Sequence, residues 1–381
     1  MVKTKLGIER VELYKELIFG KNVGLITNYT GVTSSFEENY KVFSDYCNIR
    51  KIFSPEHGLH GVAEAGENVE SYYDNVLKID VVSLYGTHNS PTVLELKGID
   101  ILIFDIQDIG IRYYTYIYTM LESMRVAETV GIPFIVMDRP LPLGRQEPIG
   151  EVLTNEYFSF VGMLELPNSY GLTIGELANW IQKKQLTRLK LRVIPLENWD
   201  NNLNILENEL PWVSPSPNLP SLDSVRLYTG LCLIEGTNVS EGRGTVYPFQ
   251  QIGAPWIDCH QLMERLRGKI SGDGIMIQPV WFIPNTSKYA GEVCQGVRFH
   301  ITDREVNSLY LGYILLDALR SLYPKDFKCD LVSTNIGVEH KFIEYLAGIK
   351  IDKYTDFELL ANKITKANTM FKEEVKKYFL Y

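Results

Sequence analysis

Three short apolar runs in the first half of the chain each end at a cluster of polar residues. The clusters occupy residues 54–58, 105–110 and 138–140. Helical patterns lie between the runs, and this arrangement is typical of buried parallel strands. Ligands bind just beyond the carboxyl ends of such strands. The pattern therefore predicts that the three clusters meet in one crevice that is rich in carboxylates.

Strands and helices alternate through this half of the chain. The apolar runs predict strands at residues 23–27, 49–53, 81–84, 101–104, 132–137 and 189–195. Helices are expected from Ser34 or Ser35 and over residues 114–130, and Thr173 with Glu176 forms a capping box that opens a third helix. Repeated alternation of this kind predicts an α/β fold with a Rossmann-like, mostly parallel sheet.

An Asn- and Pro-rich stretch at residues 200–222 interrupts the alternation. A chain of 381 residues is long enough for two domains. We therefore expect a Rossmann-like catalytic domain over residues 1–226. Beyond it, a helical pattern, two strand-like runs and further helices predict a smaller α+β domain over residues 227–381.

Composition narrows the classes of partner. The formal net charge of −9 argues against a nucleic-acid or anionic membrane partner, because both bind a basic face. No stretch approaches the roughly 18 apolar residues of a membrane span. The N-terminus lacks the apolar segment of a signal peptide. We therefore expect a cytoplasmic protein, or an exported one if a targeting segment has been removed.

The sequence lacks the motifs of common cofactor sites. The first predicted strand is followed by Thr-Asn-Tyr-Thr-Gly instead of Gly-x-Gly-x-x-Gly, and no Walker A loop occurs. The five cysteines are scattered, without a Cys-x-x-Cys pair. We therefore expect no cofactor and no metal ion.

Carboxylates are the most prominent catalytic candidates. Glu56 and His57 follow the second predicted strand, where a partly buried glutamate beside an imidazole can act as general acid or base. Asp105 and Asp108 follow another buried strand, and Glu241 lies in a glycine-rich loop. Each has a structural alternative, since a carboxylate at such a position can instead accept hydrogen bonds from backbone amides. Glycoside hydrolysis is the reaction class that needs two carboxyl groups and no cofactor.

The same clusters supply candidates for substrate binding. An arginine followed by two tyrosines suits an anionic, ring-shaped ligand, although Arg112 can also pair with a neighbouring aspartate and Arg139 with Asp138. The candidates for binding are Asn28, Arg112, Tyr113, Tyr114, Arg139, Glu235, Asn238, Arg243 and Lys288.

Several motifs stand in an order that identifies a family. They are residues 28–31, 54–58, 65–67, 83–86, 104–108, 137–140, 215–218, 235–245, 253–256 and 288–292. In this order the chain resembles the NamZ-type exo-β-N-acetylmuramidases over nearly its whole length. The resemblance implies release of terminal N-acetylmuramic acid from the non-reducing end of peptidoglycan fragments, in a cleft between two domains. Members of the family are expected to use acidic residues in that cleft, and the resemblance points first to Glu56, whereas His60 departs from the arginine expected at its position.

Muramic acid carries a lactyl carboxylate, so an acidic protein needs a local cation to bind it. Arg112, Arg139 and Arg243 are the available donors for a bidentate clamp. The expected partner is therefore a small muramyl saccharide or muropeptide. Two other functions stay open: a muropeptide-binding protein without turnover, and a metal-dependent amide or ester hydrolase that uses His57 and His60 with Glu67.

Overall fold

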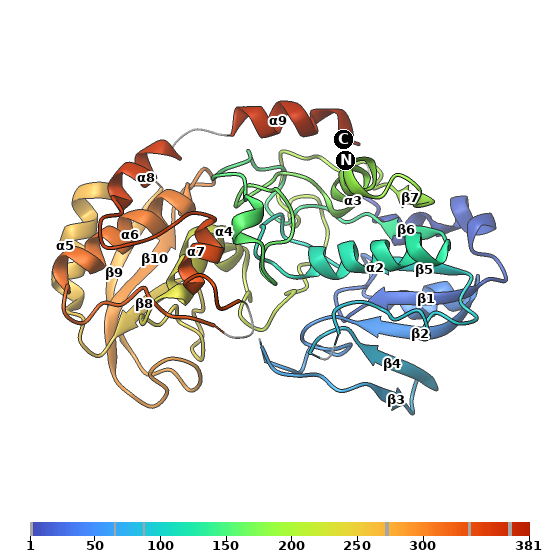
Figure 1. The fold of residues 1–381 in the computed structure, drawn as a ribbon, viewed down its shortest axis with the longest axis horizontal. Helices are drawn as coiled ribbons and strands as arrows, with labels where there is room; N and C mark the ends of the chain where they lie inside the picture. The colour runs from blue at the N-terminus through green and yellow to red at the C-terminus, as the bar shows by residue number, and fades with distance from the viewer. Residues whose placement is uncertain (1–2, 65, 87, 271–273, 334–336, 365–367) are drawn as a thin grey trace.

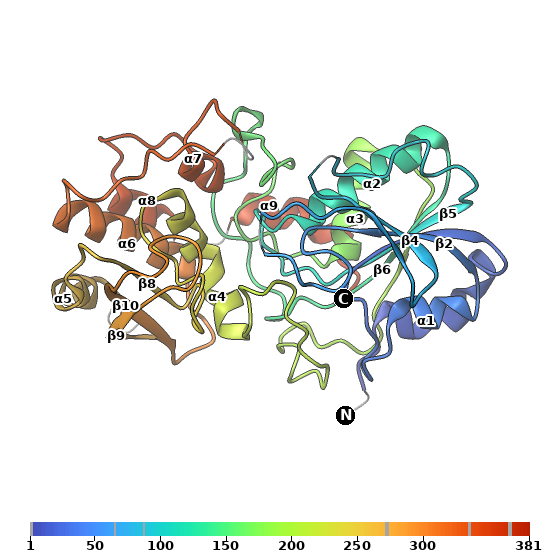
Figure 2. The same ribbon diagram turned by 90° about the horizontal axis from the view of Figure 1, so that it is seen from below.

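The computed structural model describes residues 3–64, 66–86, 88–270, 274–333, 337–364 and 368–381. Two lobes lie side by side along the long axis of the molecule, and Figure 2 shows the same division from below. The N-terminal lobe (residues 3–221) contains a seven-stranded sheet, and the C-terminal lobe (residues 222–364) contains a three-stranded sheet.

The large sheet has the strand order β3-β4-β2-β1-β5-β6-β7 (Figure 1). Its strands are β1 (Asn22–Thr27), β2 (Asn48–Ser54), β3 (Tyr72–Asp74), β4 (Ile79–Ser83), β5 (Ile101–Asp105), β6 (Phe134–Met137) and β7 (Leu191–Ile194). All neighbouring pairs are parallel except β3 with β4. Apart from the edge strand β3, this is the strand order of dinucleotide-binding folds. The predicted α/β fold with a mostly parallel sheet is confirmed.

Local sequence explains where the helices of this lobe begin and end. Helix α2 (Tyr116–Val130) ends at Gly131, whose φ of 78° is the left-handed conformation that glycine adopts freely. Helix α3 (Ile174–Gln185) begins with the predicted capping box, in which the hydroxyl of Thr173 accepts a hydrogen bond from the Glu176 amide. The predicted helix from Ser34 was wrong, since α1 spans Asn39–Ser44. Ser34 instead donates its amide to Glu9 of the 3-10 helix Gly7–Leu17.

The C-terminal lobe packs helices against its small antiparallel sheet, as the predicted α+β class requires. The sheet has the order β8-β10-β9. Its elements are α4 (Leu222–Leu231), the 3-10 helix Cys232–Gly236, β8 (Gln251–Ala254), α5 (Cys259–Ile270), β9 (Ile275–Phe282), β10 (Cys294–Ile301), α6 (Ser308–Leu322), α7 (Phe342–Ala347) and α8 (Phe357–Lys363). The predicted boundary after residue 226 falls inside α4, and the division of domains stays a prediction.

The end of the chain returns to the N-terminal lobe. Helix α9 (Thr369–Val375) lies over α3 in Figure 1. The Trp180 indole donates a hydrogen bond to Glu374, and the Tyr381 hydroxyl donates to Asp138 at 2.8 Å. Residues 368–381 therefore pack on the first lobe although the sequence assigns them to the second. No helix among the described residues is long and apolar enough to span a membrane.

Candidate active site

A cavity of about 550 Å³ lies between the two lobes. The N-terminal lobe contributes acidic and aromatic side chains, and the C-terminal lobe contributes two glutamates and two cations. Lining residues include Glu56, His57, Glu64, Glu67, Tyr113, Tyr114, Thr115, Glu235, Glu241, Arg243 and Lys288. Many of the residues chosen from sequence therefore meet in one place, although the two sets are about 180 residues apart in the chain.

Glu56 follows β2 and is held on both carboxylate oxygens. The Gly66 amide donates to Oε1 at 3.0 Å, and the Thr115 hydroxyl donates to Oε2 at 2.8 Å. The next residue, His57, has a φ of 72°, a conformation that non-glycine residues rarely adopt. Its Nδ1 lies 2.8 Å from the Ala63 carbonyl oxygen. The backbone therefore turns sharply at His57, with Glu56 at the cavity.

A network of two glutamates and two cations forms the C-terminal wall. Arg243 lies 2.8 Å from Glu235 through Nη2 and 3.2 Å from Glu241 through Nε. Lys288 lies 3.0 Å from the other oxygen of Glu241. Lys288 also donates to three backbone carbonyl groups, those of residues 234, 235 and 239. Its ammonium group is therefore fully occupied within the protein.

The cations keep Glu241 ionised. Burial alone would raise the pKa of Glu241, but Lys288 and Arg243 outweigh it and lower the pKa. Burial would lower the pKa of Arg243, and the carboxylates of Glu235 and Glu241 raise it instead. A permanently ionised glutamate can stabilise positive charge or act as a nucleophile, but it cannot donate a proton.

Unusual backbone geometry positions this wall. Ser287 and Tyr289, on either side of Lys288, have φ values of 67° and 59°. Gly242 and Gly244 have φ values of 84° and 73° and flank Arg243. A Cβ at Gly244 would lie only 2.5 Å from the backbone nitrogen of residue 286. Glycine is required there because two loops touch through their backbones.

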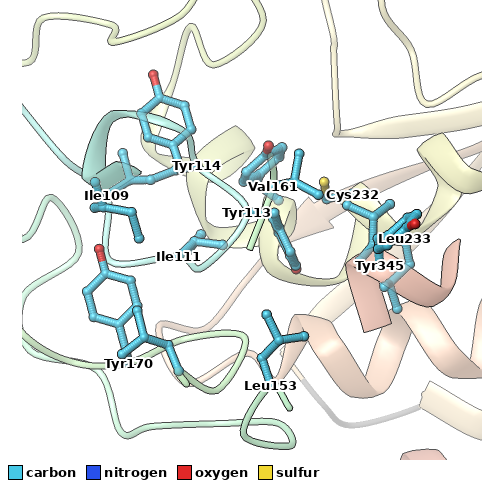
Figure 3. Close-up of a cluster of buried hydrophobic side chains, with 14 of the residues drawn as sticks. Ile109, Ile111, Tyr113, Tyr114, Leu153, Val161, Tyr170, Cys232, Leu233 and Tyr345 are labelled. Atoms are coloured by element: carbon cyan, nitrogen blue, oxygen red, sulfur yellow. The ribbon is translucent and has the colours of Figure 1, made fainter. Parts of the chain in front are cut away.

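Buried tyrosines hold the loops around the cavity within the N-terminal lobe, and Tyr113 also donates its hydroxyl proton across to the Thr229 carbonyl oxygen of the second lobe. Tyr114 donates its hydroxyl proton to the carbonyl oxygen of Pro215 at 2.7 Å, and Tyr116 donates to the same oxygen at 2.8 Å. Figure 3 shows Tyr113 in one buried cluster with Cys232 and Tyr345 of the C-terminal lobe. Burial raises the pKa of the hydroxyl groups of Tyr113, Tyr114 and Tyr116. It also raises the pKa of the Cys232 thiol. These groups therefore stay protonated at ordinary pH, and all four residues line the cavity.

Two family models together cover almost the entire chain. The model described as exo-beta-N-acetylmuramidase NamZ, N-terminal, matches residues 23–223, and its C-terminal counterpart matches residues 226–381. The chain belongs to the NamZ family. It is 40% identical over 388 residues to the peptidoglycan beta-N-acetylmuramidase NamZ of Bacillus subtilis, with 100% of this chain and 92% of that protein covered.

Crystal structures of two DUF1343 family proteins from Bacteroides fragilis share the fold. One is 29% identical with a TM-score of 0.85, and the alignment covers 100% of both chains. The other is 27% identical with a TM-score of 0.73 and covers 100% of this chain and 99% of its own. The family expectation and the α/β expectation of the sequence are thus confirmed.

Two predicted residues of this NamZ family member pair with each other away from the cavity. Arg139 binds Asp105 through Nε at 2.6 Å and through Nη2 at 3.0 Å, and the Asn39 amide donates to Asp105 at 2.8 Å. Both charged side chains are buried and neither lines the cavity. We therefore withdraw Asp105 as a catalytic carboxylate and Arg139 as a substrate ligand.

Asp108 and Arg112 are also buried outside the cavity lining. Asp108 accepts hydrogen bonds from the Tyr170 hydroxyl and, at 2.9 Å, from the Gly110 amide. Burial raises its pKa to about 6. Arg112 donates only to backbone carbonyl groups, at residues 151, 166 and 346, and burial lowers its pKa. The predicted catalytic role of Asp108 and the predicted clamp role of Arg112 are not supported.

Two asparagines and one histidine likewise lie elsewhere. Asn28 accepts hydrogen bonds from Thr30, and Asn238 bonds to the backbone of residues 326 and 328. Neither lines the cavity. His60 lies 3.2 Å from Asp74 and faces a different, smaller cavity. His57, His60 and Glu67 therefore do not converge, and no metal-ligating group of three occurs within the residues that the structure describes.

Sequence reasoning missed several residues of the cavity. Thr115, Ser216 and Asn218 line it. The last two lie in the motif at 215–218, which supported the family resemblance but was not assigned to the site. Thr115 stands at a helix start, where threonine is common for purely structural reasons, so no sequence signal distinguishes it.

Proposed function

We propose that the cavity binds a terminal N-acetylmuramic acid residue of peptidoglycan fragments and that Glu56 takes part in hydrolysis of its glycosidic bond. The observation that carries the proposal is the pair of different carboxylates in one cavity, Glu56 from one lobe and the ion-paired Glu241 from the other. The relative from Bacillus subtilis, a peptidoglycan beta-N-acetylmuramidase, supports the choice of substrate.

The two carboxyl groups suit different tasks. Glu56 is partly exposed at the cavity and bound only by neutral donors, so it can exchange a proton with the glycosidic oxygen or with water. Glu241 stays ionised beside Lys288 and Arg243, as a group that faces the positive charge of an oxocarbenium-like transition state should. In this proposal Glu56 is the acid or base, and Glu241 stabilises charge or acts as the nucleophile.

Arg243 acts on the substrate through its glutamates. Its Nε and Nη2 bind Glu241 and Glu235, and its Nη1 is buried from solvent. Because it is the only one of the three candidate arginines that lines the cavity, a free arginine clamp for the lactyl carboxylate is absent from the described part of the site. Neutral donors such as Ser216 and Asn218 are left to contact that carboxylate.

Replacement of Glu56 by Gln tests the proposal. We expect kcat on an aryl N-acetylmuramide to fall by roughly a hundredfold or more, because glutamine cannot transfer a proton. Melting temperature should change little, since the glutamine oxygen can still accept from the Gly66 amide and its NH2 group can donate to the Thr115 hydroxyl, which can also act as an acceptor. Glu70→Gln, an exposed change in the same loop region, is the control and should retain full activity.

The same assay separates the other functions. Wild-type protein should hydrolyse the muramide in EDTA and prefer it to the matching glucosaminide. Binding without turnover would identify a muropeptide-binding protein. Loss of activity in EDTA would favour the metal-dependent hydrolase, and near-normal turnover of Glu56→Gln would remove Glu56 from the mechanism.

A further inference from the structure

Thr115 stands at the start of α2 but does not cap that helix. A threonine in the N-cap position usually accepts a hydrogen bond from an amide of the first turn, as Thr173 does for α3. The Thr115 side chain makes no such bond. Its hydroxyl donates instead to Glu56 Oε2 at 2.8 Å. The Thr115 backbone is already helical, with φ −73° and ψ −16°, so its hydroxyl serves the candidate catalytic residue and does not cap the helix.

The Thr115 hydroxyl is rigidly placed. Its backbone carbonyl accepts hydrogen bonds from the amides of Tyr118 at 3.0 Å and Thr119 at 3.3 Å, within the first turn of a 15-residue helix. The side chains of Tyr116 and Ile117 that follow are fully buried. A donor attached to such an element can move little, so it restricts the orientation of whatever it binds.

The opposite oxygen of Glu56 is bound by a different kind of group. The Gly66 amide belongs to an exposed loop, and no atom would crowd a side chain there. Two side-chain hydroxyl groups reach Glu56, that of Thr115 from helix α2 and that of Tyr85 from a loop after β4. A loop amide thus binds Oε1 of Glu56, and a helix residue binds Oε2. The helix is the more rigid of the two, so it fixes the orientation of the carboxylate.

We infer that Thr115 is a positioning residue that orients the Glu56 carboxylate for proton transfer. The inference rests on the proposed function of Glu56. An acid or base that loses its orientation loses rate in the chemical step, while contacts that bind the sugar are retained. The effect should therefore appear in kcat and leave KM unchanged.

Thr115→Val removes the hydroxyl and keeps the shape of the side chain. We expect kcat on an aryl N-acetylmuramide to fall about tenfold or more, with KM within about twofold of wild type. Thr115→Ser restores the donor and should recover kcat to within about threefold. Thr129→Val, an exposed change on the same helix whose hydroxyl bonds only to the Arg125 carbonyl, is the matched control and should leave both constants unchanged.

The outcomes distinguish this inference from the proposal beneath it. Full kcat in Thr115→Val, with Glu56→Gln inactive, would overturn the positioning role and leave Glu56 as the catalytic group. Activity in Glu56→Gln would instead overturn the proposed function. If Thr115→Val does not fold, Thr115→Ala and Thr115→Ser decide: equal kcat values in these two would also overturn the inference.

Discussion

The Asp108 side chain is a buried carboxyl group in which one of the two oxygens accepts no hydrogen bond from the residues that the structure describes. Its Oδ2 accepts from Tyr170 and Gly110, whereas its buried Oδ1 has no hydrogen-bond partner among the described residues. Burial raises its pKa to about 6, above the roughly 3.9 of an unfolded chain. The folded protein therefore holds this proton more tightly than the unfolded chain does.

This difference makes stability depend on pH with a defined sign. Stability from this group is greatest below pH 4, falls as the pH rises to about 6, and is constant above that, with a total change on the order of 3 kcal/mol. Asp108→Asn should remove the decline, because asparagine does not ionise. Urea unfolding between pH 4 and 7 measures it, and an unchanged slope in the variant would contradict this assignment.

Residue types indicated the chemistry of the site but not which groups were already paired. Glu56, Glu235, Glu241 and Arg243, which the sequence selects because they follow a buried strand or lie in a glycine-rich loop, line the cavity. Asp105 carried the same signal and is neutralised by Arg139. A sequence shows both charges but not the 2.6 Å distance between them, so it cannot separate an ion pair from a free catalytic group.

The loop that carries Arg243 depends on contacts between two backbones. Gly244 presses against residue 286, and its carbonyl accepts a hydrogen bond from the Asn285 amide at 2.8 Å. Gly244→Ala should push that segment away and displace Lys288 from Glu241, with about a tenfold loss in kcat. Steady-state kinetics on the muramide and a melting curve measure the two effects.

The variant Gly291→Ala is a control for Gly244→Ala. It introduces the same backbone strain at a positive φ but no steric clash of the added methyl group. Gly291 also has a positive φ, 81°, but no atom lies within 4 Å of the Cβ position. This control should cost about 1 kcal/mol in stability and leave kcat intact. An equal fall in kcat in both variants would show that the contact with residue 286 is not responsible.

Elements with an uninterrupted apolar run or a capped first turn were predicted well, and elements without such a local signal were not. Strands β5 and β6 are visible in the sequence as uninterrupted apolar runs, because both of their faces are buried. Helix α3 is visible because its capping box marks the first turn. The three-residue β3 and the four-residue β8, which contains a glutamine and a glycine, have no uninterrupted apolar run of the kind that marks the equally short β6. They form because a neighbouring strand offers hydrogen bonds.

At the scale of the molecule, the crevice usual for this sheet order is closed. Beyond β1 and β5, where dinucleotides bind in related folds, the chain places its own ion pair between Asp105 and Arg139, and the Thr27 hydroxyl donates to the Asp105 carbonyl at 2.9 Å. The open cavity lies instead beyond β2 and against the second lobe. The rule that ligands bind beyond strand ends therefore predicts the edge of the sheet at which the cavity lies, but it does not indicate which strand the cavity follows.

Arg112 ties the lobes together without a carboxylate partner. It donates to the carbonyl groups of residues 151 and 166 in the first lobe and of Leu346 in the second, at 2.8–2.9 Å. Arg112→Met keeps the length of the side chain and leaves three buried carbonyl groups without this donor. We expect a loss of stability on the order of 3 kcal/mol or more, measured by urea unfolding.

The loss should be concentrated where the lobes meet. Leu346 lies in α7 and also lines the cavity, so hydrogen exchange of the α7 amides should accelerate more than that of β5 in the first lobe. Arg188→Met, at a side chain that is 84% exposed, is the control and should change stability by less than about 0.5 kcal/mol. Equal acceleration of amide hydrogen exchange in both lobes would contradict the idea that Arg112 stabilises mainly the contact between the lobes. Wild-type stability would show that burial of the apolar cluster in Figure 3 is sufficient to hold the lobes together.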